Sequence, residues 1–275
     1  MGRKLQEMLF VLLIILNEPN MSAADCSCLV AMLCDCCSLN LTSCFPNLPA
    51  LKWLSLTLNE ITYLHPETFS NLPKLAVLFL NGNQISSIQP GTFSKLTQLD
   101  KLYLDHNRIT YIRSGTFSNL PSLKCLVLHF NQIITISPGA FSNLPQLQSL
   151  YLYSNQITDL QSGTFSYFPQ LEALFLNYNK ISNIQDGSFL NIPKLHTLAL
   201  NNNQISTLPP SSYYIFVFTA KVDIGFNPWH CDCQMVPFRL LMGRSHSFEN
   251  EIRCAQPQHF LGHLLKDINP EHLIC

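Results

Sequence analysis

The chain has 275 residues, of which 47% are hydrophobic, and it carries a formal net charge of −1. This length and apolar fraction exclude a disordered chain and are sufficient for a large core. The nearly neutral charge also argues against a nucleic-acid partner, because proteins that bind nucleic acids usually present a basic face.

Residues 1–24 have the pattern of a secretory signal peptide. Arg3 and Lys4 supply a positive start, residues 8–16 form an apolar run, and small residues precede Asp25. The run is far shorter than the roughly 20 residues that cross a bilayer. We predict cleavage before Asp25, secretion, and no membrane insertion by the mature chain; an uncleaved anchor is the alternative, and N-terminal sequencing distinguishes the two.

Eleven cysteines indicate an oxidising compartment, where disulfide bonds form. Residues 25–50 are expected to form an N-terminal cysteine-rich cap with three disulfides, although six cysteines permit fifteen connectivities and the pairing stays open. Asn40, in the sequence Asn-Leu-Thr, is a candidate N-glycosylation site in this cap. The cysteines of this cap are Cys26, Cys28, Cys34, Cys36, Cys37 and Cys44.

Residues 51–226 repeat a pattern of 24 residues, with about seven copies and a partial eighth. A fixed period of this size predicts a solenoid, in which each coil needs neighbours to bury its apolar face. In the L-x-x-L-x-L part of each copy, alternate residues of a short strand point into the core. One asparagine per coil can satisfy the backbone groups of the buried turn that follows. These asparagines are Asn59, Asn83, Asn107, Asn131, Asn155, Asn179, Asn203 and Asn227.

This pattern resembles extracellular leucine-rich repeat proteins, such as Toll-like, Nogo and Slit ectodomains and the variable lymphocyte receptors of jawless vertebrates. The resemblance extends over almost everything after residue 25. It implies an α/β solenoid: a curved right-handed superhelix with a parallel β-sheet on its concave face, a mostly irregular convex side, and a disulfide-bonded cap at each end.

Residues 227–275 resemble the C-terminal cysteine-rich cap of that family. The segment Asn227-Pro-Trp-His-Cys-Asp-Cys is followed by two further cysteines, and the resemblance implies that Cys231 pairs with Cys254 and Cys233 with Cys275. A zinc site built from His230 and three of these cysteines is the alternative. Because Cys-x-Cys is shorter than the usual zinc-ligand spacing, we expect disulfides and no metal.

Two features precede this cap. Val222 and Ile224 lie one period beyond the seventh strand and are expected to form an eighth. The segment 213–219 departs from the repeat, and we expect it to bulge outward.

The variable strand positions should form columns about 5 Å apart on the concave face. Several hold aromatic side chains that the scaffold does not require, and such side chains anchor protein interfaces. The alternative is that aromatic residues simply favour strands and pack on one another. The predicted ligand-binding residues are Phe79, Tyr103, Asp105, His106, His129, Phe130, Tyr151, Tyr153, Phe175 and Tyr178.

Cys125, His129 and Asp105 also lie on this face, which raises the possibility of a nucleophilic triad. However, Cys125 and His129 are four residues apart on one strand, a distance of roughly 13 Å and beyond hydrogen-bond reach. Asp105 and His129 share a column and are expected to form a surface ion pair worth about 0–1 kcal/mol. Lys101 should neighbour Cys125 and could lower the pKa of its thiol. We therefore expect no catalysis and no cofactor.

Two functions outside catalysis remain. By the resemblance, the first is an extracellular recognition module that binds a protein ligand through the concave face, in innate immunity or in cell adhesion and signalling. The alternative is an extracellular-matrix protein that binds fibres or a glycosaminoglycan. A polyanion would need a basic stripe, and heparin retention up to moderate salt would favour this alternative. The lysines of the concave face are offset by acids: Lys52, Lys101 and Lys124 against Asp100, Asp105 and Glu172.

Overall fold

The structure is a computed structural model that describes residues 27–29, 33–35, 49–241, 248 and 251–275. The predicted signal peptide, Asn40 and the sulfur atoms of the six N-terminal cysteines lie outside the described part. The predictions made for them therefore remain predictions.

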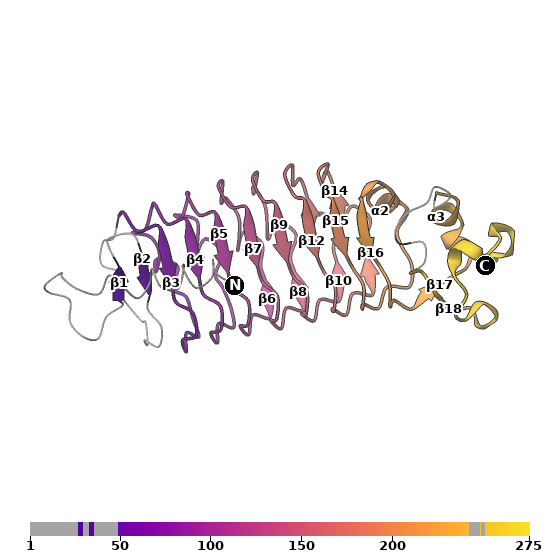
Figure 1. The fold of residues 1–275 in the computed structure, drawn as a ribbon, viewed down its shortest axis with the longest axis horizontal. Helices are drawn as coiled ribbons and strands as arrows, with labels where there is room; N and C mark the ends of the chain where they lie inside the picture. Colours follow the sequence, from indigo (N-terminus) through magenta and orange to yellow (C-terminus); the bar gives the residue numbers. More distant parts are fainter. Residues whose placement is uncertain (1–26, 30–32, 36–48, 242–247, 249–250) are drawn as a thin grey trace, which may run out of the picture.

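One long sheet runs along the solenoid, and ten strands of the described residues form it (Figure 1). The first two strands pair antiparallel, and every later neighbour pairs parallel. We call it the main sheet; it confirms the predicted solenoid. In spatial order its strands are β1 (Ser27–Leu29), β2 (Leu33–Asp35), β3 (Trp53–Ser55), β4 (Val77–Phe79), β5 (Lys101–Tyr103), β7 (Cys125–Val127), β9 (Ser149–Tyr151), β12 (Ala173–Phe175), β15 (Thr197–Ala199) and β16 (Lys221–Asp223).

The register of the main sheet follows the 24-residue period. Leu102 of β5 lies opposite Leu78 of β4 and Leu126 of β7, and all three side chains are fully buried. Each leucine therefore packs on its counterparts in the coils before and after it, as in other solenoids.

Stacked phenylalanines line the far side of the core. Neighbouring rings from Phe69 to Phe189 lie 5.9–6.1 Å apart and nearly parallel. Outside the main sheet lie two-residue parallel pairs. These are β6 (Tyr111–Ile112) with β8 (Thr135–Ile136), β10 (Asp159–Leu160) with β13 (Asn183–Ile184), and β11 (Phe165–Ser166) with β14 (Phe189–Leu190). Strands β6, β8 and β10 lie toward the lower edge of the view and β14 toward the upper edge (Figure 1).

The asparagine column forms a ladder of side-chain hydrogen bonds. Nδ2 of Asn131 donates to the carbonyl oxygens of Leu104 and Leu128, and its Oδ1 accepts the backbone N–H of Ile109. Asn83, Asn107, Asn155, Asn179, Asn203 and Asn227 repeat this arrangement. A turn that could not reach water thus has its donors and acceptors paired, as the sequence predicted.

The C-terminal cap begins after the eighth coil. Disulfides join Cys231 to Cys254 and Cys233 to Cys275, the pairing that the resemblance implied. Trp229 is fully buried and donates from Nε1 to the carbonyl oxygen of Ile224. The elements here are β17 (Trp229–His230), η3 (Cys233–Met235), α3 (Val236–Leu241), β18 (Cys254–Gln256), η4 (Gln258–Phe260), η5 (Leu265–Asp267) and η6 (Pro270–His272).

The segment before the cap departs from the repeat, but it does not simply bulge outward. It forms η2 (Pro210–Ser212) and α2 (Tyr213–Phe218), and the helix turns Tyr213 and Phe216 into the core. Within the described residues, no helix is long and apolar enough to span a membrane.

Candidate functional site

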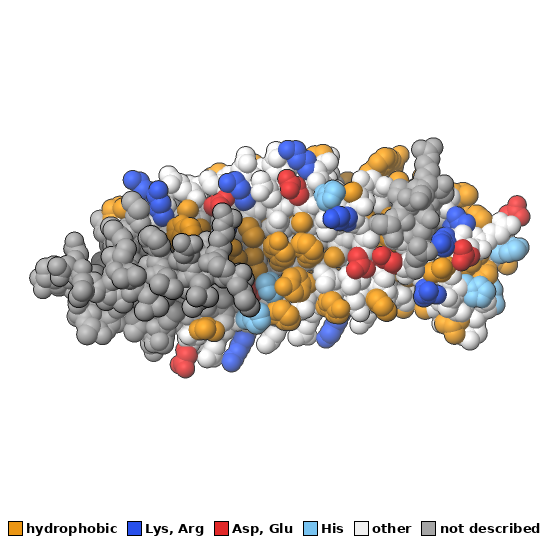
Figure 2. All heavy atoms as spheres, in the orientation of Figure 1, with side chains coloured by type: hydrophobic (Ala, Val, Ile, Leu, Met, Phe, Trp, Pro, Cys, Tyr) orange, Lys and Arg blue, Asp and Glu red, His pale blue; other side chains and the backbone are white. Residues whose placement is uncertain are grey.

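The outward side chains of the main sheet form a continuous surface, which we call the sheet face. In the main-sheet strands from β3 to β15 they flank a buried leucine, as Ser149 and Tyr151 flank Leu150 in β9. Because neighbouring strands lie about 4.8 Å apart, equivalent residues form columns across the strands. Hydrophobic side chains gather at the centre of this face (Figure 2).

The column between the second and third leucines holds two stacked aromatic pairs. The rings of Phe79 and Tyr103 lie 4.7 Å apart, and those of Tyr151 and Phe175 lie 4.9 Å apart. Val127 separates the two pairs and is buried between them. The sequence predicted these residues on one face, and the structure shows that they form pairs rather than a continuous ladder.

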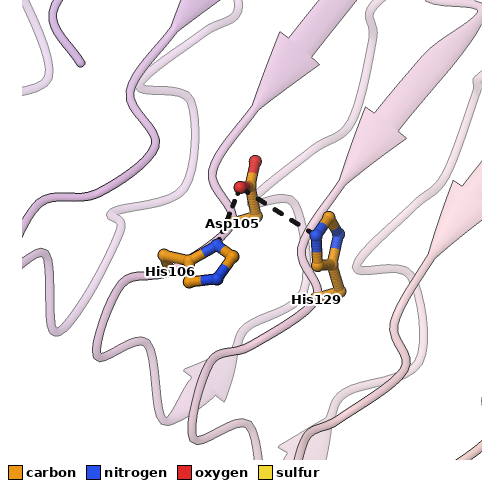
Figure 3. A group of neighbouring side chains, drawn as sticks. All are labelled: Asp105, His106 and His129. Atoms are coloured by element: carbon orange, nitrogen blue, oxygen red, sulfur yellow. Dashed lines mark hydrogen bonds and ion pairs between the residues drawn. The ribbon is translucent and has the colours of Figure 1, made fainter. Parts of the chain in front are cut away.

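The next column brings Asp105, His129 and Tyr153 together. The imidazole of His129 stacks on the ring of Tyr153 with 4.4 Å between centroids. Oδ2 of Asp105 lies 3.9 Å from Nε2 of His129 and only 3.0 Å from Nδ1 of the neighbouring His106 (Figure 3). The expected partner of Asp105 is therefore present, but a second histidine is closer.

Burial perturbs several groups on this face. It lowers the pKa of His129, although the Asp105 carboxylate opposes the shift, so this imidazole is neutral at pH 7. Burial is also the main cause of a raised pKa for Tyr103 and Tyr153, with neighbouring acidic groups adding to it. The phenols keep their protons and can donate hydrogen bonds to a ligand.

The residue before each ladder asparagine has a positive φ, which places it in a turn at the edge of the sheet face. Phe130 has φ 50° and Tyr178 has φ 54°, and their side chains are 47% and 55% exposed. Left-handed backbone costs a non-glycine residue roughly 1–2 kcal/mol. The scaffold alone would favour glycine here, as at Gly82. Phe130 nevertheless contacts the histidines, because its ring lies 4.7 Å from that of His106.

The sequence analysis missed part of this face. Trp53 occupies the column one residue before the second leucine and is 51% exposed, beside Val77 on β4. Leu58 is also exposed, at the left-handed position of its coil. The sequence does carry a signal for Trp53, because the scaffold does not require a tryptophan at this variable strand position.

Cys125 lies on the sheet face, and its thiol is free within the described part of the chain. Burial raises the pKa of this thiol, and nearby Lys101 only partly offsets the effect. Lys101 does neighbour Cys125 and lowers its pKa, as the sequence predicted, but desolvation outweighs the lysine charge and the thiol is not activated.

Two clusters of potential metal ligands occur among the described residues. One consists of Asp105, His106 and His129, and the other of Asp232, Cys233 and Cys275. The sulfurs of the second cluster are bonded to each other. The alternative zinc site of the C-terminal cap is wrong for the same reason, since its three cysteines are all in disulfides.

An apolar hollow of about 670 Å³ lies away from the sheet face, beside helix α2. The rings of Tyr214 and Phe218 project from the helix, stack on each other and remain exposed. Sequence analysis gave no indication of this hollow, because it depends on the orientation of α2. Its lining includes Tyr167, Phe189, Ile192, Leu195, Tyr214 and Phe218.

Comparison with known proteins establishes the class. Residues 49–109, 97–157 and 145–205 match the leucine rich repeat family, so the chain belongs to that family. The platelet glycoprotein Ib beta chain of Rattus norvegicus is 34% identical over 67 residues, which is 24% of this chain and 32% of the relative.

Three solved structures share the fold. The TLR13–ssRNA13 complex matches with a TM-score of 0.62 and 31% identity over 66% of this chain and 26% of that one. The Toll–Spatzle complex from Drosophila matches with a TM-score of 0.67 and 27% identity, over 82% of this chain and 33% of that one. Human trophoblast glycoprotein matches with a TM-score of 0.65 over 94% of this chain and 100% of that one. Its sequence identity is 23%, so this match shows the fold alone. The chain thus spans about a third or less of the first relatives it matches.

Proposed function

We propose that this protein is a non-catalytic extracellular recognition module that binds a protein ligand through the sheet face. The observation that carries the proposal is the pair of aromatic stacks, Phe79 with Tyr103 and Tyr151 with Phe175, on a rigid open sheet. We further propose that it acts in innate immune recognition or in cell adhesion and signalling, as a secreted or cell-surface protein.

The physical argument begins with preorganisation. Each ring is held by its stacked neighbour and by a strand with in-register pairing on both sides. An aromatic side chain fixed in this way loses little conformational entropy on binding, and aromatic residues dominate interface energetics. The sheet face therefore offers several rigid anchors close together.

Relatives support a binding role. The Toll structure was solved as a complex with the protein Spatzle. The TLR13 structure holds a single-stranded RNA, so the fold also accommodates a polyanion. For this chain we favour a protein ligand, because the sheet face has mixed charge: Nζ of Lys124 lies 3.0 Å from the Asp100 carboxylate, and Asp105 sits beside the aromatic stacks.

A binding screen with matched variants tests the proposal. The protein expressed from the full chain would be screened against a library of defined extracellular proteins and microbial surface components, with heparin and single-stranded RNA as polyanion probes. One variant carries Tyr103→Ala, Tyr151→Ala and Phe175→Ala. The control variant removes three exposed tyrosine rings outside the main sheet, at Tyr63, Tyr111 and Tyr167.

We expect a protein hit that the sheet-face variant loses and the control variant keeps. Truncation of an anchor residue typically costs about 2 kcal/mol or more, so three truncations should weaken binding by at least a thousandfold. Circular dichroism checks that both variants are folded. A protein hit that survives the sheet-face substitutions contradicts the assigned surface. Binding only to heparin, lost at moderate salt, supports the matrix alternative, and RNA binding alone also refutes the proposal.

A further inference from the structure

We propose that Asp105, His106 and His129 form a binding site for a divalent transition-metal ion of the zinc type. The site lies on the sheet face, at the end of β5 and in the adjacent coil (Figure 3). It goes beyond protein recognition and does not depend on it.

The geometry of the donor atoms supports this site. One ligand atom from each residue lies within 4.8 Å of the other two. Zinc binds imidazole nitrogen and carboxylate oxygen at about 2.0–2.2 Å, which places tetrahedral ligand atoms roughly 3.3 Å apart. The observed 3.0 Å from Asp105 Oδ2 to His106 Nδ1 is close to that separation, and the 3.9 Å to His129 Nε2 needs only a small contraction.

Two of the three ligands are already fixed in place. The side chains of Asp105 and His129 are only 14% and 17% exposed, and the His129 ring is stacked against Tyr153. His106 is more exposed and can rotate toward the ion. A site with two fixed ligands and one adjustable ligand loses little entropy when the ion binds.

Without an ion, the Asp105 carboxylate is held by a hydrogen bond of 3.0 Å from Nδ1 of His106. Asp105 contacts two histidines, and among the described residues no lysine or arginine forms an ion pair with it. The 3.9 Å from its carboxylate to His129 is too long for a hydrogen bond. A bound cation would compensate the carboxylate and take the place of the proton that His106 shares with it.

The donor set indicates the kind of ion. Two imidazoles and one carboxylate suit Zn²⁺, Cu²⁺ or Ni²⁺ better than Ca²⁺ or Mg²⁺, which prefer shells made only of oxygen. Three protein ligands leave a position open to solvent. Sequence analysis expected no metal and treated Asp105 with His129 as an ion pair, because the closer approach of His106 depends on its left-handed turn.

Calorimetry with matched variants tests the site. Protein expressed from the full chain, freed of metal with chelator, would be titrated with ZnCl₂, and Co²⁺ absorption would report the coordination number. The ligand variants are Asp105→Asn, His106→Asn and His129→Gln; asparagine tolerates the left-handed backbone at position 106. The control is His230→Gln, because His230 and Asp232 also approach to 3.9 Å.

We expect one zinc ion per chain, at least tenfold weaker binding in each ligand variant, and unchanged binding in the control. Co²⁺ should give the absorption of a four- or five-coordinate site, which Asp105→Asn weakens. No binding, or undiminished affinity in Asp105→Asn and His106→Asn, overturns the proposal. His106 is exposed, so its variant remains informative if His129→Gln misfolds. Loss of zinc without loss of the protein hit would leave the proposed function intact.

Discussion

Substituting one ladder asparagine tests how the solenoid is held together. In Asn131→Ala, the side chain that spans two coils is lost from a position that is 7% exposed. Its Nδ2 no longer reaches the carbonyl oxygens of Leu104 and Leu128, and its Oδ1 no longer accepts from Ile109. The three backbone groups are not affected equally.

The carbonyl oxygens keep a second partner. Leu104 still accepts from Asn107, and Leu128 still accepts from Asn155. Within the described structure the N–H of Ile109 has no other acceptor, so that group is left buried and unpaired. An unsatisfied buried donor costs about 1–3 kcal/mol and each weakened hydrogen bond about 0.5–1.5 kcal/mol. We therefore expect Asn131→Ala to lower the free energy of unfolding by about 2–6 kcal/mol.

Urea denaturation followed by circular dichroism measures this change. The matched control is Asn177→Ala, which removes an asparagine of the sheet face whose Oδ1 has no hydrogen-bond partner among the described residues; its effect should stay within about 0.5 kcal/mol. Hydrogen exchange adds a local signal, because the amide of Ile109 should lose protection first. If Asn131→Ala costs no more than Asn177→Ala, the asparagine ladder does not stabilise the turns.

Three further predictions concern the cap and the sheet face. Replacing both cysteines of the Cys231–Cys254 disulfide by serine should lower the free energy of unfolding by about 3 kcal/mol, because the disulfide closes a loop in the unfolded chain and reduces its entropy. Thermal unfolding of the parent and the variant, with and without reductant, measures this change. Equal unfolding midpoints for the two proteins without reductant would count against it. Burial raises the pKa of Glu251, so its stabilising contribution is present at low pH and lost as pH rises through the folded-state pKa. Glu251→Gln should therefore unfold at higher urea than the parent near about pH 7, with the gap closing toward about pH 4; a gap independent of pH would refute this. Because burial raises the pKa of Cys125, iodoacetamide should modify its thiol several-fold more slowly in the folded protein than in the urea-unfolded protein. Mass spectrometry of the peptide that contains Cys125 measures both rates, and a faster reaction in the folded protein would contradict the prediction.

The sequence predicted those features that depend on a single coil and its copies. Leu102, Phe117 and Asn131 each have counterparts at the same position in the other coils, so their burial follows from the requirement that similar coils stack. The repeat also predicted that strands of successive coils run parallel, because each coil must return to the same side of the solenoid. The eighth strand was placed correctly because the asparagine column continues to Asn227.

Features that depend on differences between coils were harder to predict. Phe130 and Tyr178 were assigned to the sheet face without their left-handed backbone, because an apolar residue gives no local sign of positive φ. Val127 divides the aromatic column into two pairs, and that outcome depends on ring packing rather than on spacing. Helix α2 lies where the repeat fails, so the period carried no information about it.

The backbone hydrogen bonds of the main sheet do not depend on the aromatic side chains. The amide of Leu104 donates to the carbonyl of Val127 at 2.8 Å, and the amide of Leu128 donates to that of Tyr151 at the same distance. The amide of Leu176 donates to Ala199, again at 2.8 Å. Valine, tyrosine and alanine thus occupy equivalent positions with the same sheet geometry, so the strand pairing is insensitive to the side chain that it presents. The column is therefore free to carry the ligand contacts proposed for Phe79, Tyr103, Tyr151 and Phe175 without a cost in strand pairing.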